Sequence, residues 1–322
     1  MRLGVLTSGG DAPGMNAAIR AAVRQADALG IEVVGIHHGF RGVVEGDWAP
    51  MGTRDCANIL QRGGTVLRTA RCAEFLDVSV RARATEGLRK AGINALAVIG
   101  GDGSFRGAEA LWLEQGIRCG GIPGTIDNDL PGTDRTLGFD TALNTAVEAI
   151  DRIRDTASSH DRIFLVEVMG RSSGMLAVHT AIACGAEFVL YPEAEDDTFE
   201  ELVRQLRLSA ERGKGSSIVV VAEGDQLGSA VGLGERLRRD YALDLRVAVL
   251  GHIQRGGSPT ALDRIWGSRW GAEAVKRLAT GEEAFYLGVQ AGEMVALPLA
   301  TVHERPSPPP KDLASLLAVL AR

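Results

Sequence analysis

The sequence predicts an α/β fold built from two doubly wound, Rossmann-like subdomains with mostly parallel sheets. Short apolar runs alternate with amphipathic stretches along nearly the whole chain, the runs are continuously apolar, and several end in a glycine-rich turn. Continuous apolar runs are typical of parallel strands that are buried on both faces. Repeated strand–helix units form doubly wound sheets.

The apolar runs and the helical periodicity place the elements along the chain. We expect strands at Leu3–Leu6, Val33–Ile36, Ala95–Ile99, Ile163–Val168, Phe188–Leu190, Ile218–Val221 and Val247–Leu250. We expect helices at Ala17–Leu29, Thr141–Ala157 and Thr198–Arg212. The second helix is predicted to bury one apolar stripe, formed by Leu143, Val147, Ile150 and Ile153.

The 322 residues suffice for two core-sized subdomains. We expect a large subdomain at 1–138 plus 251–305, because the stretch from Gly251 is predicted to return to the first sheet. A smaller subdomain is expected at 139–250 plus 306–322. The proline-rich stretch Arg305–Pro310 is predicted to be a stiff spacer before a short terminal helix.

Composition narrows the classes of partner. With 45% hydrophobic and 24% charged residues, the chain has the make-up of a soluble globular protein. Its net charge of -6 argues against nucleic-acid and anionic-membrane partners, and no apolar run is long enough to span a bilayer. The four cysteines are dispersed without a CxxC pair and the N-terminus lacks signal-peptide features, so we expect reduced thiols and a cytoplasmic location.

The acidic glycine turn Gly100–Ser104 follows an expected strand. Open α/β sheets bind ligands at the carboxyl ends of their strands, and Mg²⁺ favours one or two carboxylates together with phosphate oxygens. Asp102 is therefore a candidate Mg²⁺ ligand in a phosphoryl-transfer site. The alternative is that Asp102 or Ser104 merely caps the following helix.

A second acidic turn, Pro123–Asp129, lies a short distance further along. Asp127 and Asp129 are two residues apart, so in an extended segment both side chains point to the same side. Two such carboxylates can divide the roles of general base and metal support. The alternative is an Asx turn in a surface loop.

Three further segments carry candidate phosphate contacts. Thr7–Asn16 joins an expected strand to a helix, where glycine backbone and the helix N-terminus suit phosphate; a tight turn without ligand is the alternative. In Met169–Gly174, Arg171 is a candidate to neutralise phosphate charge. In Gly251–Gly257, His252 and Arg255 are candidates to bind a sugar phosphate. The alternative is that His252 has a purely structural role.

Other patterns are less informative or missing. Arg20 and Arg24 form a like-charge pair at helical spacing, which either binds an anion or lies on a solvated face near Asp27. His37 and His38 are expected at the end of a strand. We find no dinucleotide fingerprint, no nucleophile–His–acid arrangement and no His or Cys metal cluster in the sequence, which argues against a dinucleotide-dependent dehydrogenase.

These motifs, in this order and over roughly Gly4 to Arg305, resemble the bacterial ATP-dependent 6-phosphofructokinases. The Gly100–Ser104 turn alone is also similar to that of NAD kinases and diacylglycerol kinases, whereas the ordered set is specific. The resemblance implies that the large subdomain binds ATP and the smaller one fructose 6-phosphate. It also implies transfer of the ATP γ-phosphoryl group to O1 of the sugar.

The resemblance carries residue roles onto this sequence. It implies that Asp127 is the base, Arg171 stabilises the transition state, Thr125 binds the transferring phosphoryl group, and Asp129 and Arg71 assist. The implied ATP-binding residues are Gly10, Phe40, Arg71, Cys72, Asp102, Gly103 and Ser104, with Asp102 and Asp129 on Mg²⁺. The implied fructose 6-phosphate residues are Thr125, Asp127, Met169, Gly170, Arg171, Glu223, His252 and Arg255, together with Arg162 and Arg246 from a neighbouring subunit.

The resemblance further implies a homotetramer with an effector site for ADP or phosphoenolpyruvate. The matching residues are Arg20, Arg24, Arg54, Arg154, Gly185, Glu187, Arg212 and Lys214. The chain departs from the family pattern at Thr53 and Asn58, where relatives often carry an arginine and an acid. Both departures lie in the effector region, so they bear on regulation rather than on catalysis.

Two glycines indicate which phosphoryl donor the chain uses. In pyrophosphate-dependent relatives an aspartate typically follows the residue matching Asp102, and a lysine typically precedes the one matching Thr125. This chain has Gly103 and Gly124 at those positions, which favours ATP over pyrophosphate. An inactive sensor that keeps only the effector site is expected to lose Asp127 or Arg171, and this chain has both.

Overall fold

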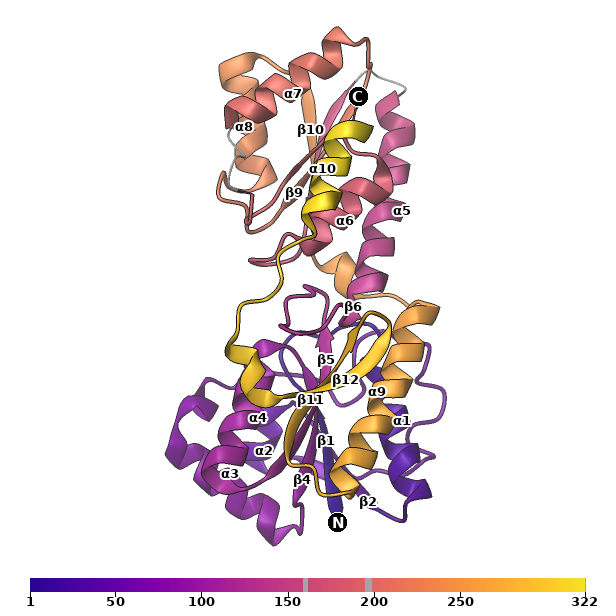
Figure 1. The fold of residues 1–322 in the computed structure, drawn as a ribbon, viewed down its shortest axis with the longest axis vertical. Coiled ribbons are helices and arrows are strands. Elements are labelled where there is room, and N and C mark those ends of the chain that lie inside the picture. Colours follow the sequence, from indigo (N-terminus) through magenta and orange to yellow (C-terminus); the bar gives the residue numbers. More distant parts are fainter. Residues whose placement is uncertain (159–161, 195–198, 322) are drawn as a thin grey trace. The chain divides into compact units, whose positions relative to one another are not determined.

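The computed structural model describes residues 1–158, 162–194 and 199–321. The chain divides into two compact units: unit 1 comprises Met1–Thr141 and Arg255–Ser307, and unit 2 comprises Ala142–Gln254 and Pro308–Arg322. Each unit contains one sheet with helices on both of its faces (Figure 1). The mixed α/β architecture and the mostly parallel strand pairs confirm the predicted fold class.

Unit 1 is built on an eight-stranded sheet of order β12-β11-β5-β4-β1-β2-β3, in which β6 also pairs with β5. Most neighbours are parallel, whereas β2·β3 and β11·β12 are antiparallel. The strands are β1 (Arg2–Thr7), β2 (Glu32–Ile36), β3 (Trp48–Pro50), β4 (Ala95–Gly100), β5 (Arg118–Thr125), β6 (Leu137–Gly138), β11 (Ala284–Gln290) and β12 (Glu293–Pro298).

Helices cover both faces of this sheet. They are α1 (Met15–Ala28), α2 (Phe40–Glu45), α3 (Val78–Lys90), α4 (Asp102–Gln115) and α9 (Ala261–Ala279), with short 3-10 segments η1 (Ala73–Leu76) and η3 (Leu299–His303). Helices α1 and α9 pack closely, since a Cβ on Gly271 of α9 would lie 2.3 Å from the carbonyl oxygen of Ala18 in α1. The opposite face carries α2, α3 and α4 over a core that includes Leu96, Val98 and Phe105.

Unit 2 has a four-stranded sheet of order β10-β7-β9-β8, and all its pairs are parallel. Its strands are β7 (Ile163–Val168), β8 (Phe188–Leu190), β9 (Ser217–Ala222) and β10 (Leu245–Val249). Its helices are α6 (Met175–Cys184), α7 (Phe199–Glu211), α8 (Ala230–Tyr241) and α10 (Lys311–Leu320); α5 (Phe139–Ser158) begins in unit 1 and continues in unit 2.

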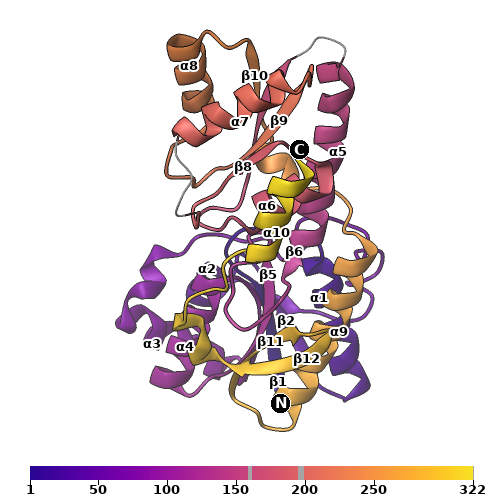
Figure 2. The same cartoon turned by 45° about the horizontal axis from the view of Figure 1, so that its top comes forward.

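Alternation along β7 divides the unit 2 core into two layers. Val166 and Val168 join a cluster with residues of α5, α6 and α10, whereas Leu165 faces a cluster with residues of α7 and α8. Figure 2 shows α6 and α10 side by side on the first of these layers. Because both faces are covered, the strands read as continuously apolar runs in the sequence.

The structure corrects several expected elements. The strand expected at Val247–Leu250 is β10, which begins at Leu245 and ends at Val249. The sequence prediction missed β3, β5, β6, β11 and β12. Strand β5 reads poorly because it contains glycines and a proline, yet those glycines are required: a Cβ on Gly121 would lie 2.6 Å from Cβ of Tyr286 in β11.

The helix predictions hold with two adjustments. In α5 the fully buried apolar positions are Ala142, Ala146, Ile150 and Ala157, whereas Leu143 and Val147 of the expected stripe are half-buried. The expected start of the third helix at Thr198 lies outside the described residues, and α7 is described from Phe199. Among the described helices, none has the length and apolar character needed to cross a bilayer.

Candidate functional site

Three loops of unit 1 meet at the carboxyl edge of its sheet. They follow the adjacent parallel strands β1, β4 and β5. A Cβ on Gly9 would lie 3.5 Å from Oγ of Ser104, and one on Gly101 would lie 3.5 Å from Cβ of Thr125. The Ser8 backbone N–H donates to the Ile99 carbonyl at 2.9 Å. The first candidate segments from the sequence are thus brought together.

Asp102 lies at the first turn of α4, where it does not act as a cap. The residue before the helix is Gly101, and no side chain caps this end. The Asp102 carboxylate forms an ion pair with Arg106 at 3.4 Å, and 44% of the side chain remains exposed. The capping alternative is therefore wrong for Asp102, and its carboxylate is accessible at the carboxyl edge of β4.

The Thr125–Asp129 turn differs from the expected extended segment. Strand β5 ends at Thr125, and Asn128 adopts a left-handed conformation with φ 50°. The turn is buried, with Asp127 only 3% exposed. The hydroxyl of Thr136 donates to the Thr125 carbonyl at 2.6 Å and to Oδ1 of Asn128 at 3.1 Å. The extended segment on which the expectation for Asp127 and Asp129 depended is therefore not formed, because the chain turns at Asn128.

The segment around Arg71 and Cys72 runs beside the first glycine loop. The Thr69 hydroxyl donates to the Gly9 carbonyl at 2.7 Å. Phe40, at the start of α2, stacks on Phe75 with ring centroids 4.3 Å apart. Burial raises the pKa of the half-buried Cys72 thiol, which keeps it in the thiol form. Arg71 is exposed, whereas Phe40 is buried in the core of unit 1.

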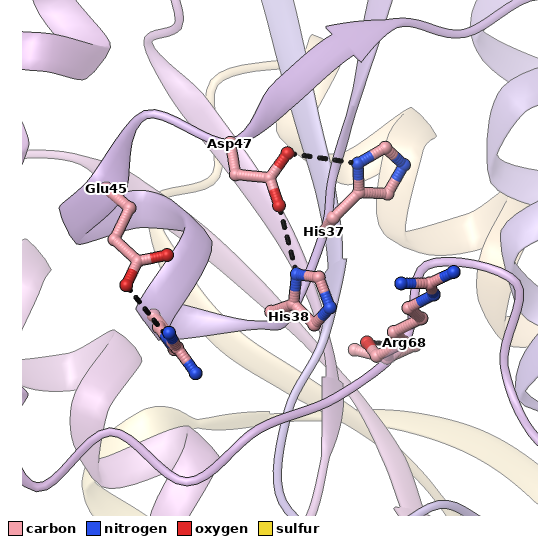
Figure 3. Close-up of polar contacts among 7 residues, drawn as sticks. His37, His38, Glu45, Asp47 and Arg68 are labelled. Carbon is pink, nitrogen blue, oxygen red and sulfur yellow. Dashed lines mark hydrogen bonds and ion pairs between the residues drawn. The ribbon is translucent and has the colours of Figure 1, made fainter.

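Two histidines follow β2 and share one acid (Figure 3). Oδ1 of Asp47 lies 3.3 Å from Nδ1 of His37, and its Oδ2 lies 3.0 Å from Nδ1 of His38. These hydrogen bonds, His38 first, lower the pKa of the Asp47 carboxyl. His38 has φ 58° and its N–H donates to the Leu67 carbonyl at 2.9 Å. The cluster fixes the turn that leads into Phe40.

A buried carboxylate holds the start of α5. Asp263 of α9 accepts hydrogen bonds from the backbone N–H of Gly138 at 2.9 Å and of Thr141 at 3.0 Å. Burial raises the pKa of Asp263 to about 6, against the opposing effect of these donors, and Asp140 raises it further. Sequence reasoning missed this residue, since nothing near it in the sequence indicates its partners.

In unit 2 the expected residues gather after β7 and β9. The Arg171 N–H donates to Oε1 of Glu223 at 2.8 Å, and the Glu223 N–H donates to the Val168 carbonyl at 3.0 Å. The turn itself is unusual, with φ 144° at Gly170 and φ 54° at Arg171. Met169, Gly170, Arg171 and Glu223 thus form one compact group, as the resemblance implies.

Arg162 and Arg246 lie at the other edge of the same sheet. They come at the amino ends of β7 and β10, and both approach Asp244, Arg162 at 3.9 Å and Arg246 at 2.6 Å. The six residues of β7 separate them from Arg171 by about 20 Å at roughly 3.3 Å per residue. Within one chain these arginines therefore do not belong to the group around Glu223.

The Gly251–Gly257 segment is divided between the two units. His252 is exposed in unit 2, whereas Arg255 belongs to unit 1, where its Nη1 donates to the Asp11 carbonyl at 3.2 Å. A Cβ on Gly10 would lie 2.5 Å from the same nitrogen. Arg255 is thus placed against the first glycine loop, a contact the sequence did not predict.

The expected effector residues fall into two groups. In unit 2, Nη2 of Arg154 donates to the Gly185 carbonyl at 3.0 Å, and Nζ of Lys214 lies 3.3 Å from Oε1 of Glu187. Arg212 is exposed nearby in sequence. In unit 1, none of the ion pairs among the described residues involves Arg20, Arg24 or Arg54. Arg24 is exposed and Arg20 half-buried, so the alternative of a solvated helix face near Asp27 stays open.

The acidic side chains do not form a preorganised metal cage. Among the described residues no group of three or more His, Cys, Asp or Glu side chains is arranged to hold an ion. Mg²⁺ is commonly bound by one or two carboxylates with phosphate oxygens and water, so a single accessible carboxylate such as Asp102 fits that mode. All four cysteines are free, and Cys56 and Cys119 are buried.

Glycine loops and acidic turns at the carboxyl edge of a doubly wound sheet place the chain in the class of nucleotide-fold α/β proteins. The phosphofructokinase family model matches residues 2–278. The chain therefore belongs to the phosphofructokinase family. It is 55% identical over 320 residues to the ATP-dependent 6-phosphofructokinase 1 of Thermus thermophilus, which covers 99% of each chain.

Other relatives and solved structures agree. The ATP-dependent 6-phosphofructokinase of Shouchella clausii is 52% identical over 305 residues, covering 95% of this chain and 94% of the relative. The phosphofructokinase structure from Saccharomyces cerevisiae matches with a TM-score of 0.86 and 33% identity; it covers all of this chain, which spans 48% of the yeast chain. A pyrophosphate-dependent phosphofructokinase from Marinobacter aquaeolei has a TM-score of 0.87 at 21% identity over 99% and 92% of the chains, which shows the fold alone.

Proposed function

We propose that the chain is an ATP-dependent 6-phosphofructokinase, which transfers the ATP γ-phosphoryl group to O1 of fructose 6-phosphate. The observation that carries this proposal is the meeting of the Gly9, Gly101 and Thr125 loops at one edge of the unit 1 sheet. Glycine backbone and a helix N-terminus supply donors for phosphate oxygens, and acidic groups stand beside them. The 55% identity to a relative named for this activity supports the same function.

Residues of unit 1 are proposed to bind ATP and to perform the proton transfer. Gly10, Gly103 and Ser104 lie in the loops that suit phosphates, with Phe40 near the adenine, Cys72 beside the nucleotide and Arg71 reaching its phosphates. Asp127 accepts the proton of the sugar 1-hydroxyl as O1 bonds to the γ-phosphorus. The bond from that phosphorus to the β–γ bridging oxygen breaks, ADP leaves, and Thr125 binds the transferring group.

Residues of unit 2 are proposed to bind fructose 6-phosphate. Met169, Gly170, Glu223 and His252 contact the sugar, and the Arg171 guanidinium balances the charge that develops on the phosphoryl oxygens. We assign Arg255 of unit 1 to the same substrate. Its hydrogen bond to the Asp11 carbonyl also links it to the first glycine loop, which is proposed to bind the ATP phosphates. Arg162 and Arg246 bind the 6-phosphate of a neighbouring subunit's substrate, which their separation from Arg171 supports.

Mg²⁺ is proposed to bind at Asp102, with Asp129 in support. The fit rests on the accessible Asp102 carboxylate at the carboxyl edge of β4, beside a loop suited to phosphates. When bound, the ion neutralises charge on the β- and γ-phosphates. The protein residues contribute orientation: the buried Thr125–Asp129 turn holds the base in place, and Arg71 offers a second cation at an exposed position.

ATP is favoured over pyrophosphate as donor on the space around two glycines. A Cβ on Gly103 would meet no protein atom within 4 Å. The space beside this glycine is therefore not filled by protein side chains and is open to a ligand. A Cβ on Gly124 would lie 3.0 Å from Cε of Met15, so a lysine there would have to displace the Met15 side chain. The Gly124 position is therefore not arranged for the lysine typical of pyrophosphate-dependent relatives, and the open space at Gly103 is proposed to be taken by ATP.

We further propose a homotetramer with an effector site for ADP or phosphoenolpyruvate, in the cytoplasm. Arg154, Gly185, Glu187 and Lys214 lie in contacting pairs, and Arg20, Arg24 and Arg54 offer cationic charge that the described residues do not neutralise. Anionic effectors would explain this charge. The four free cysteines support a reducing compartment.

A coupled assay with purified protein tests the function. Fructose 6-phosphate and Mg²⁺ are held fixed while ATP and pyrophosphate are compared as donors. We expect turnover with ATP and none with pyrophosphate. Turnover with pyrophosphate alone would overturn the donor assignment, and turnover with neither donor would overturn the proposed function.

A further inference from the structure

Gln254 is a buried polar residue in a motif whose other members already have proposed roles. It lies in the 3-10 segment η2 (Gly251–Arg255) as the last residue of that part of unit 2, and its side chain is 0% exposed. Its Oε1 accepts the backbone N–H of Met169 at 2.9 Å. Its Nε2 has no hydrogen-bond partner among the described residues. A buried amide with an unmatched donor costs free energy that a Leu or Met of similar size would avoid.

The group that Gln254 contacts is a strained turn. Arg171 is a non-glycine residue in the left-handed region, and such residues persist only where their surroundings hold them. The Arg171 N–H is held by Glu223, and a Cβ on Gly224 would lie 1.8 Å from the Arg171 carbonyl oxygen. The turn is therefore fixed from the β9 side at Arg171 and from the η2 side at Met169.

The orientation of the Gln254 amide follows from its partner. Met169 presents an N–H, so only the amide oxygen can face it, and the reversed amide would place two donors together. The role of the side chain in this structure is therefore that of an acceptor. The unmatched Nε2 donor is the energetic cost of that one hydrogen bond.

We propose that Gln254 is a positioning residue for Arg171, which it holds through the Met169 backbone. This inference rests on the proposed function, because Arg171 acts on the transferring phosphoryl group only in that reaction. Gln254 and Glu223 hold the two ends of the same turn, and losing the Gln254 bond lets the turn relax toward ordinary backbone angles. A displacement of about 1 Å at a charged group can reduce turnover by roughly 10²-fold.

Two variants separate the acceptor from the rest of the side chain. Gln254→Met keeps the volume and removes the hydrogen bond, whereas Gln254→Glu keeps an acceptor for Met169. We expect kcat to fall about 10- to 100-fold in Gln254→Met with the KM for ATP unchanged, and Gln254→Glu to recover most of that loss. Thr180→Val is the matched control, because it removes another buried polar atom of unit 2 that has no partner among the described residues.

Hydrogen exchange of the peptide that contains Met169 and Arg171 gives a readout independent of turnover. The exchange should be faster in Gln254→Met than in the wild type, and unchanged in Thr180→Val. Unchanged exchange or a kcat within twofold of the wild type would overturn the proposal. If Gln254→Met does not fold, Gln254→Asn carries the test, since its shorter side chain withdraws the oxygen from Met169 and should give the same two effects.

The failure of the proposed function has a different signature. A wild-type chain that turns over neither donor would overturn the phosphofructokinase activity and with it the catalytic part of this inference. Faster exchange in Gln254→Met would still support the positioning contact in that case. Equally slow exchange in the wild type and in Gln254→Met would overturn the contact between Gln254 and Met169 itself.

Discussion

The loops of unit 1 and of unit 2 are held in place by different means. In unit 1 the backbone itself packs closely: a Cβ on Gly100 would lie 2.5 Å from Oγ of Ser104 and 2.6 Å from the Ser8 carbonyl oxygen. In unit 2 the loops are held by polar side chains that accept backbone N–H groups, namely Gln254 at Met169 and Glu223 at Arg171. At Gly100 the close packing leaves no room for a side chain, whereas the contacts at Met169 and Arg171 depend on side chains.

The difference follows from what each loop is proposed to hold. A phosphate chain is recognised by many N–H donors that converge from the backbone, so glycine is required for close approach. A sugar phosphate is recognised by a few guanidinium and carboxylate groups, whose direction must be fixed by their neighbours. Substitutions in unit 1 should therefore act by filling space or by removing the base, and those in unit 2 by releasing or removing a charged group.

The largest expected effect is that of Asp127→Asn in unit 1. The amide is isosteric but cannot accept the proton, so kcat should fall about 10³-fold while the KM for ATP changes little. Steady-state kinetics with ATP and fructose 6-phosphate measures this. Asp134→Asn, a change at an exposed position of the same loop region, is the control and should keep near-normal turnover. A kcat within tenfold of the wild type in Asp127→Asn would exclude Asp127 as the base.

Arg162→Ala should have the next largest effect, and it should be confined to the sugar phosphate. Loss of charge-assisted hydrogen bonds to a phosphate should raise the KM for fructose 6-phosphate by about 10- to 100-fold and leave the KM for ATP unchanged. Arg204→Ala, which removes an exposed arginine paired with Glu201 at 2.5 Å, is the control. A change in the KM for ATP alone would contradict the assignment of Arg162.

Gly103→Ala should have a smaller effect that sets the two kinds of loop apart. The new methyl group meets no atom within 4 Å beyond its own helix backbone, and alanine favours a helix over glycine, so stability should not fall, yet the methyl occupies space proposed for the nucleotide phosphates. The KM for ATP should rise about tenfold, or roughly 1.4 kcal/mol, with a melting temperature no lower than that of the wild type. Gly232→Ala on α8 is the control, with no effect expected on ATP. An unchanged KM for ATP in Gly103→Ala would place the phosphates elsewhere.

The last expected effect is on stability rather than on kinetics, and it acts through Asp263. Its folded pKa of about 6 lies above the ordinary value of 3.8, so the folded state binds the proton more tightly. This contribution is present at acidic pH and is lost as pH rises from about 4 to above 6, on the order of 2–3 kcal/mol. The stability advantage of the wild type over Asp263→Asn in denaturant titrations should therefore shrink over that interval. An advantage that grows with pH would contradict the raised pKa.

Particular residues show where sequence reasoning succeeds. Strand β7 was predicted with its bounds of Ile163–Val168, because five of its six residues are apolar, as expected for a strand covered on both faces, with Glu167 the exception. The glycine turns after β1 and β4 were predicted because each of them ends an apolar run. Arg171 was a candidate from its turn after an expected strand, Glu223 was added by the family resemblance, and the structure places the two in contact.

Other residues show where it stops. Strand β5 was missed because the glycines that suit its packing against Phe285 and Tyr286 lower its strand propensity. The turn at Asn128 was expected to be extended, because a left-handed residue has no reliable signal in a single sequence. The contacts of Asp263 and Gln254 span 122 and 85 residues, and no local pattern records such a pair.

The sequence by itself determined the α/β class, the order of seven strands and of helices α1, α5, α7 and α10, and the segments that carry phosphate and acidic chemistry. It did so because burial on two faces and the conformational demands of turns act locally, on consecutive residues. Only the tertiary structure decided which loops share an edge, that Arg162 and Arg246 lie at the opposite edge from Arg171, and that Gln254 and Asp263 bind distant backbone. Those outcomes depend on strand order and on hydrogen bonds between residues far apart in the chain, which close only once the sheets have formed.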